Sequence, residues 1–124
     1  MICIRLADHK DQRYNTVGDW RYLDLNDLII TVSNTGNDAY NFLIALHELI
    51  EAQMCKDGNI SHHEVDIWDK EHLRSKDPGS IPGCPYYREH MIASAIEFTM
   101  ACFLNINWGE YEDCLDGLTK SWRE

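Results

Sequence analysis

One apolar helix restricts how this chain can fold. The segment Leu46–Ala52 reads Leu-His-Glu-Leu-Ile-Glu-Ala and lies in a helix that we expect to span about residues 39–55. Residues four apart share one face of a helix, so the side chains of His47 and Glu51 converge, with Glu48 beside them. Ionisable groups on an apolar helix are costly to bury without partners. The rest of the fold must therefore supply those partners.

A second apolar helix, expected from Tyr86 to Leu104, offers them. From Met91 to Leu104 its only ionisable side chain, thiol aside, is Glu97. A helix that is apolar on nearly every side is expected to be buried. His90 lies two turns before Glu97 on the same side of the helix. Packed antiparallel, the two helices would bring together four side chains: His47, Glu51, His90 and Glu97.

Two interpretations of this cluster stay open. Two histidines with carboxylates suit a divalent metal, for which we expect zinc first and manganese or iron as alternatives. In that case His47, Glu51 and His90 are ligands, and Glu97 is a fourth ligand or orients His90. Glu48 is then the general base for a bound water. In the other interpretation the same side chains, with Arg88 or buried tyrosines, form a hydrogen-bond network that holds no ion.

A second polar cluster reads His62-His63-x-x-Asp66-x-x-Asp69. It lies in a helix expected to begin after Ser61, where spacings of three place these side chains along one side. Asp66 and Asp69 could line the rim of the metal pocket, as could Arg88, which follows a loop rich in proline and glycine. The alternative is a solvated helix face.

The N-terminal part has the pattern of strands. Ile2, Ile4 and Leu6 alternate with Cys3 and Arg5, which predicts a short half-buried strand. Two further runs, 20–25 and 28–33, are separated by Asn26-Asp27 and predict a hairpin. The sequence therefore predicts a single α+β domain over residues 1–124. A small N-terminal antiparallel sheet would pack against three to four α-helices.

Charge and composition argue against several functions. A formal net charge of −10 disfavours nucleic acid as a partner. No apolar run approaches the roughly 18 residues needed to span a bilayer, so we expect no membrane partner. The N-terminus lacks a signal-peptide pattern, and the five cysteines lack metal spacing. These features predict a cytoplasmic protein with reduced thiols. The acidic surface could bind a basic protein surface or serve solubility alone.

The order of hairpin, strand and His-Glu helix over residues 20–55 resembles the minimal zincin core of small metallopeptidases. Their His-Glu-x-x-His signature holds two zinc ligands and the general base; this chain has Glu51 in place of the second His. The resemblance implies that the strand 28–33 holds an extended substrate, and that His47 and Glu48 act as ligand and base. The chain is also similar to HD-type metal phosphohydrolases in this helix. That class needs a metal-binding His on an earlier helix, and only His9 precedes it.

More broadly, the chain resembles a family of small proteins encoded by bacteriophages and prophages. The resemblance lies in the segments Thr16–Trp20, Ala45–Ala52, Val65–Asp69 and Pro85–His90. It implies the cytoplasm of a host cell rather than an activity. We therefore expect a phage-encoded accessory protein with an interhelical divalent-metal site, such as a zincin-like hydrolase. The alternative is a non-enzymatic acidic protein that binds and inhibits a host factor, its His/Glu cluster being a structural network.

Overall fold

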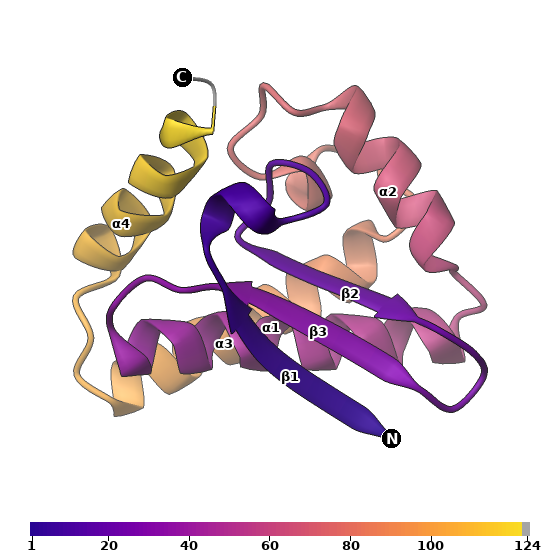
Figure 1. Cartoon of the computed structure of the whole chain (residues 1–124), viewed down its shortest axis with the longest axis horizontal. Coiled ribbons are helices and arrows are strands. Elements are labelled where there is room, and N and C mark those ends of the chain that lie inside the picture. Colours follow the sequence, from indigo (N-terminus) through magenta and orange to yellow (C-terminus); the bar gives the residue numbers. More distant parts are fainter. Residues whose placement is uncertain (123–124) are drawn as a thin grey trace.

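A computed structural model describes residues 1–122, which form a three-stranded sheet and four α-helices (Figure 1). The strands are β1 (Ile2–Ala7), β2 (Gly18–Tyr22) and β3 (Leu28–Ser33). The helices are α1 (Asp38–Asp57), α2 (His62–Glu71), α3 (Tyr87–Phe103) and α4 (Trp108–Ser121), with short 3-10 turns η1 (His9–Asp11) and η2 (Pro78–Ser80). The predicted α+β fold is confirmed. Across residues 1–122, every helix is too short or too polar to cross a membrane.

The sheet has the strand order β1-β3-β2 and is mixed. β2 and β3 are antiparallel, as the predicted hairpin requires, but β1 pairs with β3 in parallel. The prediction of a small antiparallel sheet therefore holds for β2 and β3 and is wrong for β1. β2 begins at the end of the sheet where β1 finishes, so it runs opposite to β1. β3 reverses direction again through a short turn and inserts between the two strands.

The polar residues before the helices fix where three of them begin. The side chain of Asn37 accepts a hydrogen bond from the backbone N–H of Tyr40, 3.1 Å away, at the start of α1. Ser61 caps α2 in the same way, by accepting a hydrogen bond from the backbone N–H of Glu64, and the helix begins after Ser61 as predicted. Asn107 caps α4. Each cap satisfies a backbone donor that has no partner within its own helix, and contributes about 1 kcal/mol.

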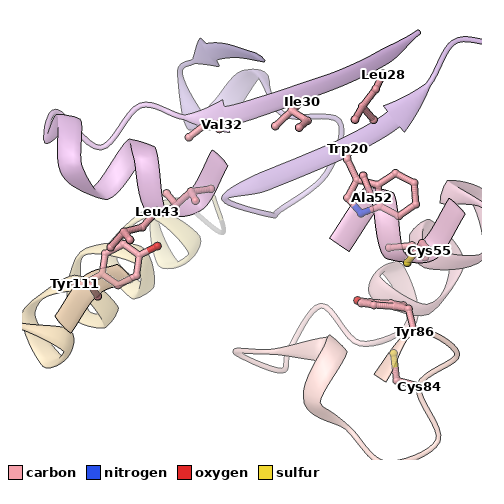
Figure 2. Close-up of a cluster of buried hydrophobic side chains, with 13 residues drawn as sticks. Trp20, Leu28, Ile30, Val32, Leu43, Ala52, Cys55, Cys84, Tyr86 and Tyr111 are labelled. Atoms are coloured by element: carbon pink, nitrogen blue, oxygen red, sulfur yellow. The ribbon is translucent and has the colours of Figure 1, made fainter. Parts of the chain in front are cut away.

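The hydrophobic core lies between the sheet and α1 (Figure 2). α1 packs on β2 and β3 on one side and on α3 on the other. Its side chains Leu43 and Ile44 are buried in this core. Burying a Leu, Ile or Val side chain contributes about 1.5–3 kcal/mol. The core members drawn from the strands and from α4 are Trp20, Leu28, Ile30, Val32 and Tyr111.

β1 and α3 both expose apolar side chains. Ile2, Ile4 and Leu6 of β1 are 61%, 49% and 52% exposed, because α1 covers β2 and β3 but does not reach under β1. α3 buries one narrow side against α1 and exposes Phe98 and Phe103 on the other. The predicted first strand is confirmed, but the apolar side chains of β1 are not buried as expected. The prediction of a buried third helix holds only for the side that faces α1.

Candidate metal centre

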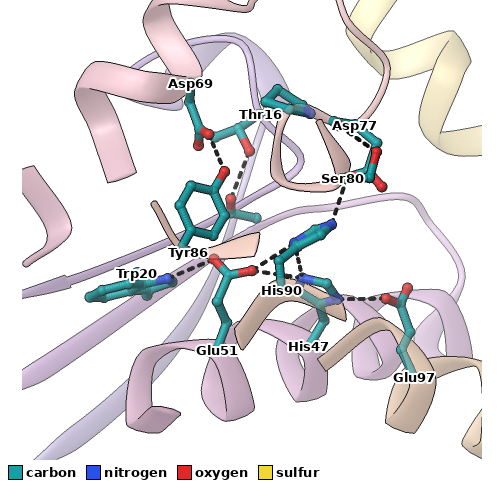
Figure 3. Close-up of polar contacts among 12 residues, drawn as sticks. Thr16, Trp20, His47, Glu51, Asp69, Asp77, Ser80, Tyr86, His90 and Glu97 are labelled. Carbon is teal, nitrogen blue, oxygen red and sulfur yellow. Dashed lines mark hydrogen bonds and ion pairs between the residues drawn. The ribbon is translucent and has the colours of Figure 1, made fainter. Parts of the chain in front are cut away.

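Two histidines and one carboxylate converge between α1 and α3 (Figure 3). His47 Nε2 lies 3.1 Å from Glu51 Oε2 and 3.2 Å from His90 Nδ1. His90 Nδ1 lies 2.8 Å from the same Glu51 oxygen. The three side chains are buried and could hold a metal ion. The predicted ligands do meet, because the helices pack antiparallel and His47 and Glu51 share one face of α1.

The second nitrogen of each histidine faces a further carboxylate. His47 Nδ1 is 2.7 Å from Glu97 Oε1. His90 Nε2 is 2.7 Å from Asp77 Oδ1, within ion-pair distance but outside hydrogen-bond geometry. Glu97 also accepts a 2.6 Å hydrogen bond from the hydroxyl of Tyr111. Glu97 thus orients His47 and not His90, which corrects the prediction. Asp77 takes the place beside His90 that had been assigned to Glu97.

Two neighbours of the cluster were missed from the sequence. The indole Nε1 of Trp20, on β2, donates a 3.0 Å hydrogen bond to Glu51 Oε1. Asp77 comes from the loop that precedes η2, where Gly79 lies so close to His90 that a Cβ would overlap the imidazole ring. The Asp-Pro-Gly sequence was a signal of a rigid turn, but nothing in its spacing related it to His90.

Hydrogen bonding governs the charge states in this cluster. Burial alone would lower the pKa of His47, but hydrogen bonds to Glu51 and Glu97 raise it well above its ordinary value. Burial would also lower the pKa of His90, but its contacts with Asp77 and Glu51 raise this pKa to about 9. Burial would raise the pKa of Glu51, but the two histidines hold it below its usual range. Without a metal, these contacts favour the protonated form of both histidines.

Glu48 lies in the cavity beside the cluster. Its carboxylate packs against Gly18, where a Cβ would overlap it, and it makes no hydrogen bond within residues 1–122. Burial raises the pKa of Glu48 well above its ordinary value, and the neighbouring Glu51 carboxylate raises it further. The cavity has a volume of about 520 Å³ and is also lined by His47, Glu51 and His90. This volume suits a small molecule or part of a longer one.

One of the three predicted rim residues lines this cavity. Asp69 accepts hydrogen bonds from the hydroxyls of Tyr14 and Tyr86, and burial raises its pKa to about 6 despite them. Asp66 lies outside the lining and pairs with Arg13 at 2.8 Å. Arg88 is exposed at the start of α3, also outside the lining. The predictions for Asp66 and Arg88 are therefore wrong.

His9 and Cys84 also lie outside the cavity lining. His9 bonds to Ser33 and Asn15, 2.8 Å from each, and does not line the cavity. The resemblance to HD-type phosphohydrolases therefore gains no ligand from it. β3 is paired on both sides, so it cannot hold an extended substrate as the zincin resemblance implied. Burial raises the pKa of the Cys84 thiol to about 11, which disfavours a reactive thiolate.

No protein-family model, curated protein or solved structure matches the chain. The chemistry of the cluster is therefore the basis on which a function can be inferred.

Proposed function

We propose that this protein is a metal-dependent hydrolase whose divalent ion is bound by His47, Glu51 and His90. One observation carries the proposal: both histidines that meet at Glu51 have a carboxylate at the other ring nitrogen. Histidines that bind metals usually donate their second N–H to a carboxylate or carbonyl, which fixes the tautomer and the ring orientation. A set of two His and one Glu is the ligand set of a class of catalytic zinc sites.

The carboxylates select the tautomers that a metal requires. With Glu97 beside Nδ1 of His47, the neutral ring carries its proton on Nδ1 and its lone pair on Nε2. With Asp77 beside Nε2 of His90, the neutral ring presents its lone pair at Nδ1. Those two nitrogens are the atoms that approach Glu51. The arrangement therefore directs two lone pairs and a carboxylate oxygen at one point.

The charge balance also favours an ion. Without one, the two protonated rings present their N–H groups to the same Glu51 oxygen, with the nitrogens only 3.2 Å apart. A divalent ion that displaces one proton from each ring leaves the net charge of the cluster unchanged. It also replaces two N–H groups that point towards each other with two nitrogen lone pairs that bind the same ion. Zinc is the ion we expect first, and manganese or iron also accept this mixed nitrogen and oxygen set.

Glu48 is the residue that we assign to proton transfer. A bound divalent ion would lower the pKa of a water to about 7 and polarise a carbonyl or phosphoryl oxygen. Glu48 lines the same cavity and has no hydrogen-bond partner within the described residues. The positive charge of a bound ion would favour the ionised form of Glu48 against the effect of burial, and that carboxylate could accept the proton from the water. Glu48 would then pass this proton to the leaving group, which completes the addition of water across the cleaved bond.

Metal content and hydrolysis test the proposal together. The protein is purified without chelators and without a metal-affinity tag, and its zinc, manganese and iron are measured by elemental analysis. We expect one ion per chain, removed by a chelator and restored by titration. Peptide, ester and phosphoester substrates are then assayed separately, and the rate of hydrolysis of at least one class should be proportional to the amount of bound metal. Glu48→Gln should abolish this hydrolysis while the ion remains bound.

A protein without stoichiometric metal would overturn the proposal. That result would favour the other function considered, an acidic protein that binds and inhibits a host factor through its surface. Metal binding without hydrolysis on any substrate would restrict the ion to a structural role. The resemblance to phage-encoded proteins stays a prediction, as does the cytoplasm of a host cell.

A further inference from the structure

The outer edge of β1 combines free backbone groups with exposed apolar side chains. β1 pairs with β3 on one side, and in residues 1–122 no strand lies on its other side (Figure 1). The strand has six residues with no proline and no acidic residue. Natural proteins usually protect such an edge with charges, proline, a bulge or a covering element. This edge has one basic residue, Arg5, whose Nε donates a 3.1 Å hydrogen bond to Thr31 Oγ1 on β3.

The hydrogen bonds to β3 identify which groups are free. The carbonyl oxygen of Met1 accepts from Leu28 N at 2.9 Å, and that of Ala7 accepts from Asn34 N at 2.8 Å. Because backbone groups alternate in direction along a strand, the odd-numbered residues of β1 face β3. The N–H and C=O groups that point away from the sheet therefore belong to three residues: Ile2, Ile4 and Leu6.

The same three residues carry the exposed apolar side chains. They pair with Leu28, Ile30 and Val32 of β3, so their side chains lie on the face of the sheet that forms the core. α1 does not extend beneath them. The face of the sheet that packs on α1 therefore extends beyond this helix, and along β1 its apolar side chains are exposed.

We propose that two copies of this chain associate through β1, which pairs antiparallel with β1 of the second copy about a twofold axis at Ile4. In this register Ile2 lies opposite Leu6, and Ile4 lies opposite Ile4. Each of these residues exchanges both outward backbone groups with its counterpart, as in a hydrogen-bonded antiparallel pair. The result is a continuous six-stranded sheet with an isologous interface.

The charges on the strand fit a second copy better than a basic partner. The strand carries no carboxylate, so an acidic chain can meet itself here without bringing acidic groups face to face. In the proposed register Arg5 lies opposite Cys3, and its bond to Thr31 directs the guanidinium away from the edge. A basic protein surface would find no acidic residue to bind on β1.

Association through β1 also ends at two copies. The other edge strand, β2, packs against α2, and the backbone N–H of Tyr22 donates a 3.3 Å hydrogen bond to His62 Nδ1. That edge is therefore covered and cannot extend the sheet into a fibre. The exposed apolar area of three side chains and one strand edge is below the roughly 800 Å² per partner of stable interfaces. We therefore infer a reversible dimer whose population depends on concentration.

Molar mass measured by light scattering over about a hundredfold dilution tests this inference. The wild-type protein should shift from dimer to monomer. Ile4→Lys places two like charges at the twofold axis and should weaken the dimer at least about tenfold. Leu25→Lys is the matched control, since Leu25 is 83% exposed in the turn before β3 and makes the same change of charge away from β1. It should leave the dimer unchanged.

A pair of proline variants separates association from folding. Ile4→Pro removes the backbone N–H of Ile4, which points away from β3, and an edge strand tolerates this loss. The variant should therefore abolish the dimer and keep the helical circular dichroism signal. Arg5→Pro removes the backbone N–H of Arg5, which points towards β3, and should destabilise the monomer itself. A wild-type protein that is monomeric at every concentration would overturn the proposal. So would a dimer that persists in Ile4→Lys and Ile4→Pro, which would instead place the contact elsewhere, such as the exposed side of α3.

Crosslinking tests the register without dependence on those variants. Arg5→Cys places a thiol opposite Cys3 of the second copy in a non-hydrogen-bonded pair, where the Cα separation of about 4.5 Å permits a disulfide. A mild oxidant should link the two copies, and the link should be lost when Cys3→Ser is added. A crosslink that survives Cys3→Ser would show that other cysteines meet and would contradict this register.

Discussion

His47 and His90 are separated by 43 residues in the chain, yet His47 Nε2 and His90 Nδ1 lie 3.2 Å apart in the interior of the protein. Two imidazole rings at this separation repel each other when both carry a proton there. The Glu51 carboxylate between them relieves part of this repulsion, and a shared metal ion would remove it.

His47→Ala should abolish metal binding and destabilise the metal-free protein. It removes one proposed ligand and leaves Glu97 and Glu51 without the ring that lies between them. Loss of one partner from a buried ionic group costs about 3 kcal/mol. Elemental analysis and urea unfolding measure the two effects. His63→Ala, at an exposed position on α2, is the control and should change neither. Unchanged metal content in His47→Ala would rule out His47 as a ligand.

Glu97→Gln should weaken metal binding by about 10- to 100-fold without removing a ligand. The amide keeps a hydrogen bond to His47 Nδ1 but loses the charge that raises the basicity of the ring. Asp77→Asn should have a smaller effect, because the Asp77 side chain is 53% exposed and partly screened by solvent. Competition with a chromophoric chelator measures the affinities. Equal affinities for Glu97→Gln and an exposed-site variant, Asp8→Asn, would contradict this role for Glu97.

The metal-free protein should lose stability as the pH rises from about 6.5 to about 9. The folded pKa of His90 is raised to about 9 from 6.5, so its protonated form stabilises the fold. This contribution is present in full below pH 6.5 and is lost as the pH passes 9; it amounts to at most about 3 kcal/mol.

Urea unfolding in chelator across this pH range measures the effect. Metal affinity should rise over the same range, because each ligand histidine must lose a proton before it binds. Stability that is flat or rising with pH in chelator would contradict the pKa assigned to His90.

Gly79→Ala should impair the proposed metal centre, although Gly79 is not one of its ligands. Its added Cβ would overlap the imidazole ring of His90, so either the ring or the η2 turn must move. We expect a loss of about 1–3 kcal/mol in stability and a weaker affinity for metal. Gly117→Ala is a matched control on α4, where a Cβ meets no atom of the described chain, and it should stabilise the helix by about 0.5–1 kcal/mol. A Gly79→Ala protein with wild-type metal affinity would show that the η2 turn can move without displacing His90, which would contradict this prediction.

The helices and their contacts were largely predictable from the sequence. The caps at Asn37, Ser61 and Asn107 depend on local geometry that the sequence specifies directly. The convergence of His47, Glu51 and His90 followed from helical spacing together with the cost of burying charges.

Contacts that depend on the path of the loops were not predictable. Asp77 reaches His90 because η2, in the loop after α2, packs against α3, and no periodicity in the sequence encodes that contact. Glu97 was assigned to the wrong histidine, because the register between two helices depends on packing and not on either sequence alone. The parallel pairing of β1 with β3 was also missed, because it depends on the path of the loop that places the start of β2.

Trp20 gives the protein an optical reporter of its own. Its indole N–H is hydrogen-bonded to one oxygen of Glu51, and the other oxygen faces the two histidines. Any ion or proton that draws electron density from that carboxylate must also change the electric field along the indole ring. The emission of this buried fluorophore would therefore register the occupancy of the cluster in unlabelled protein, in real time.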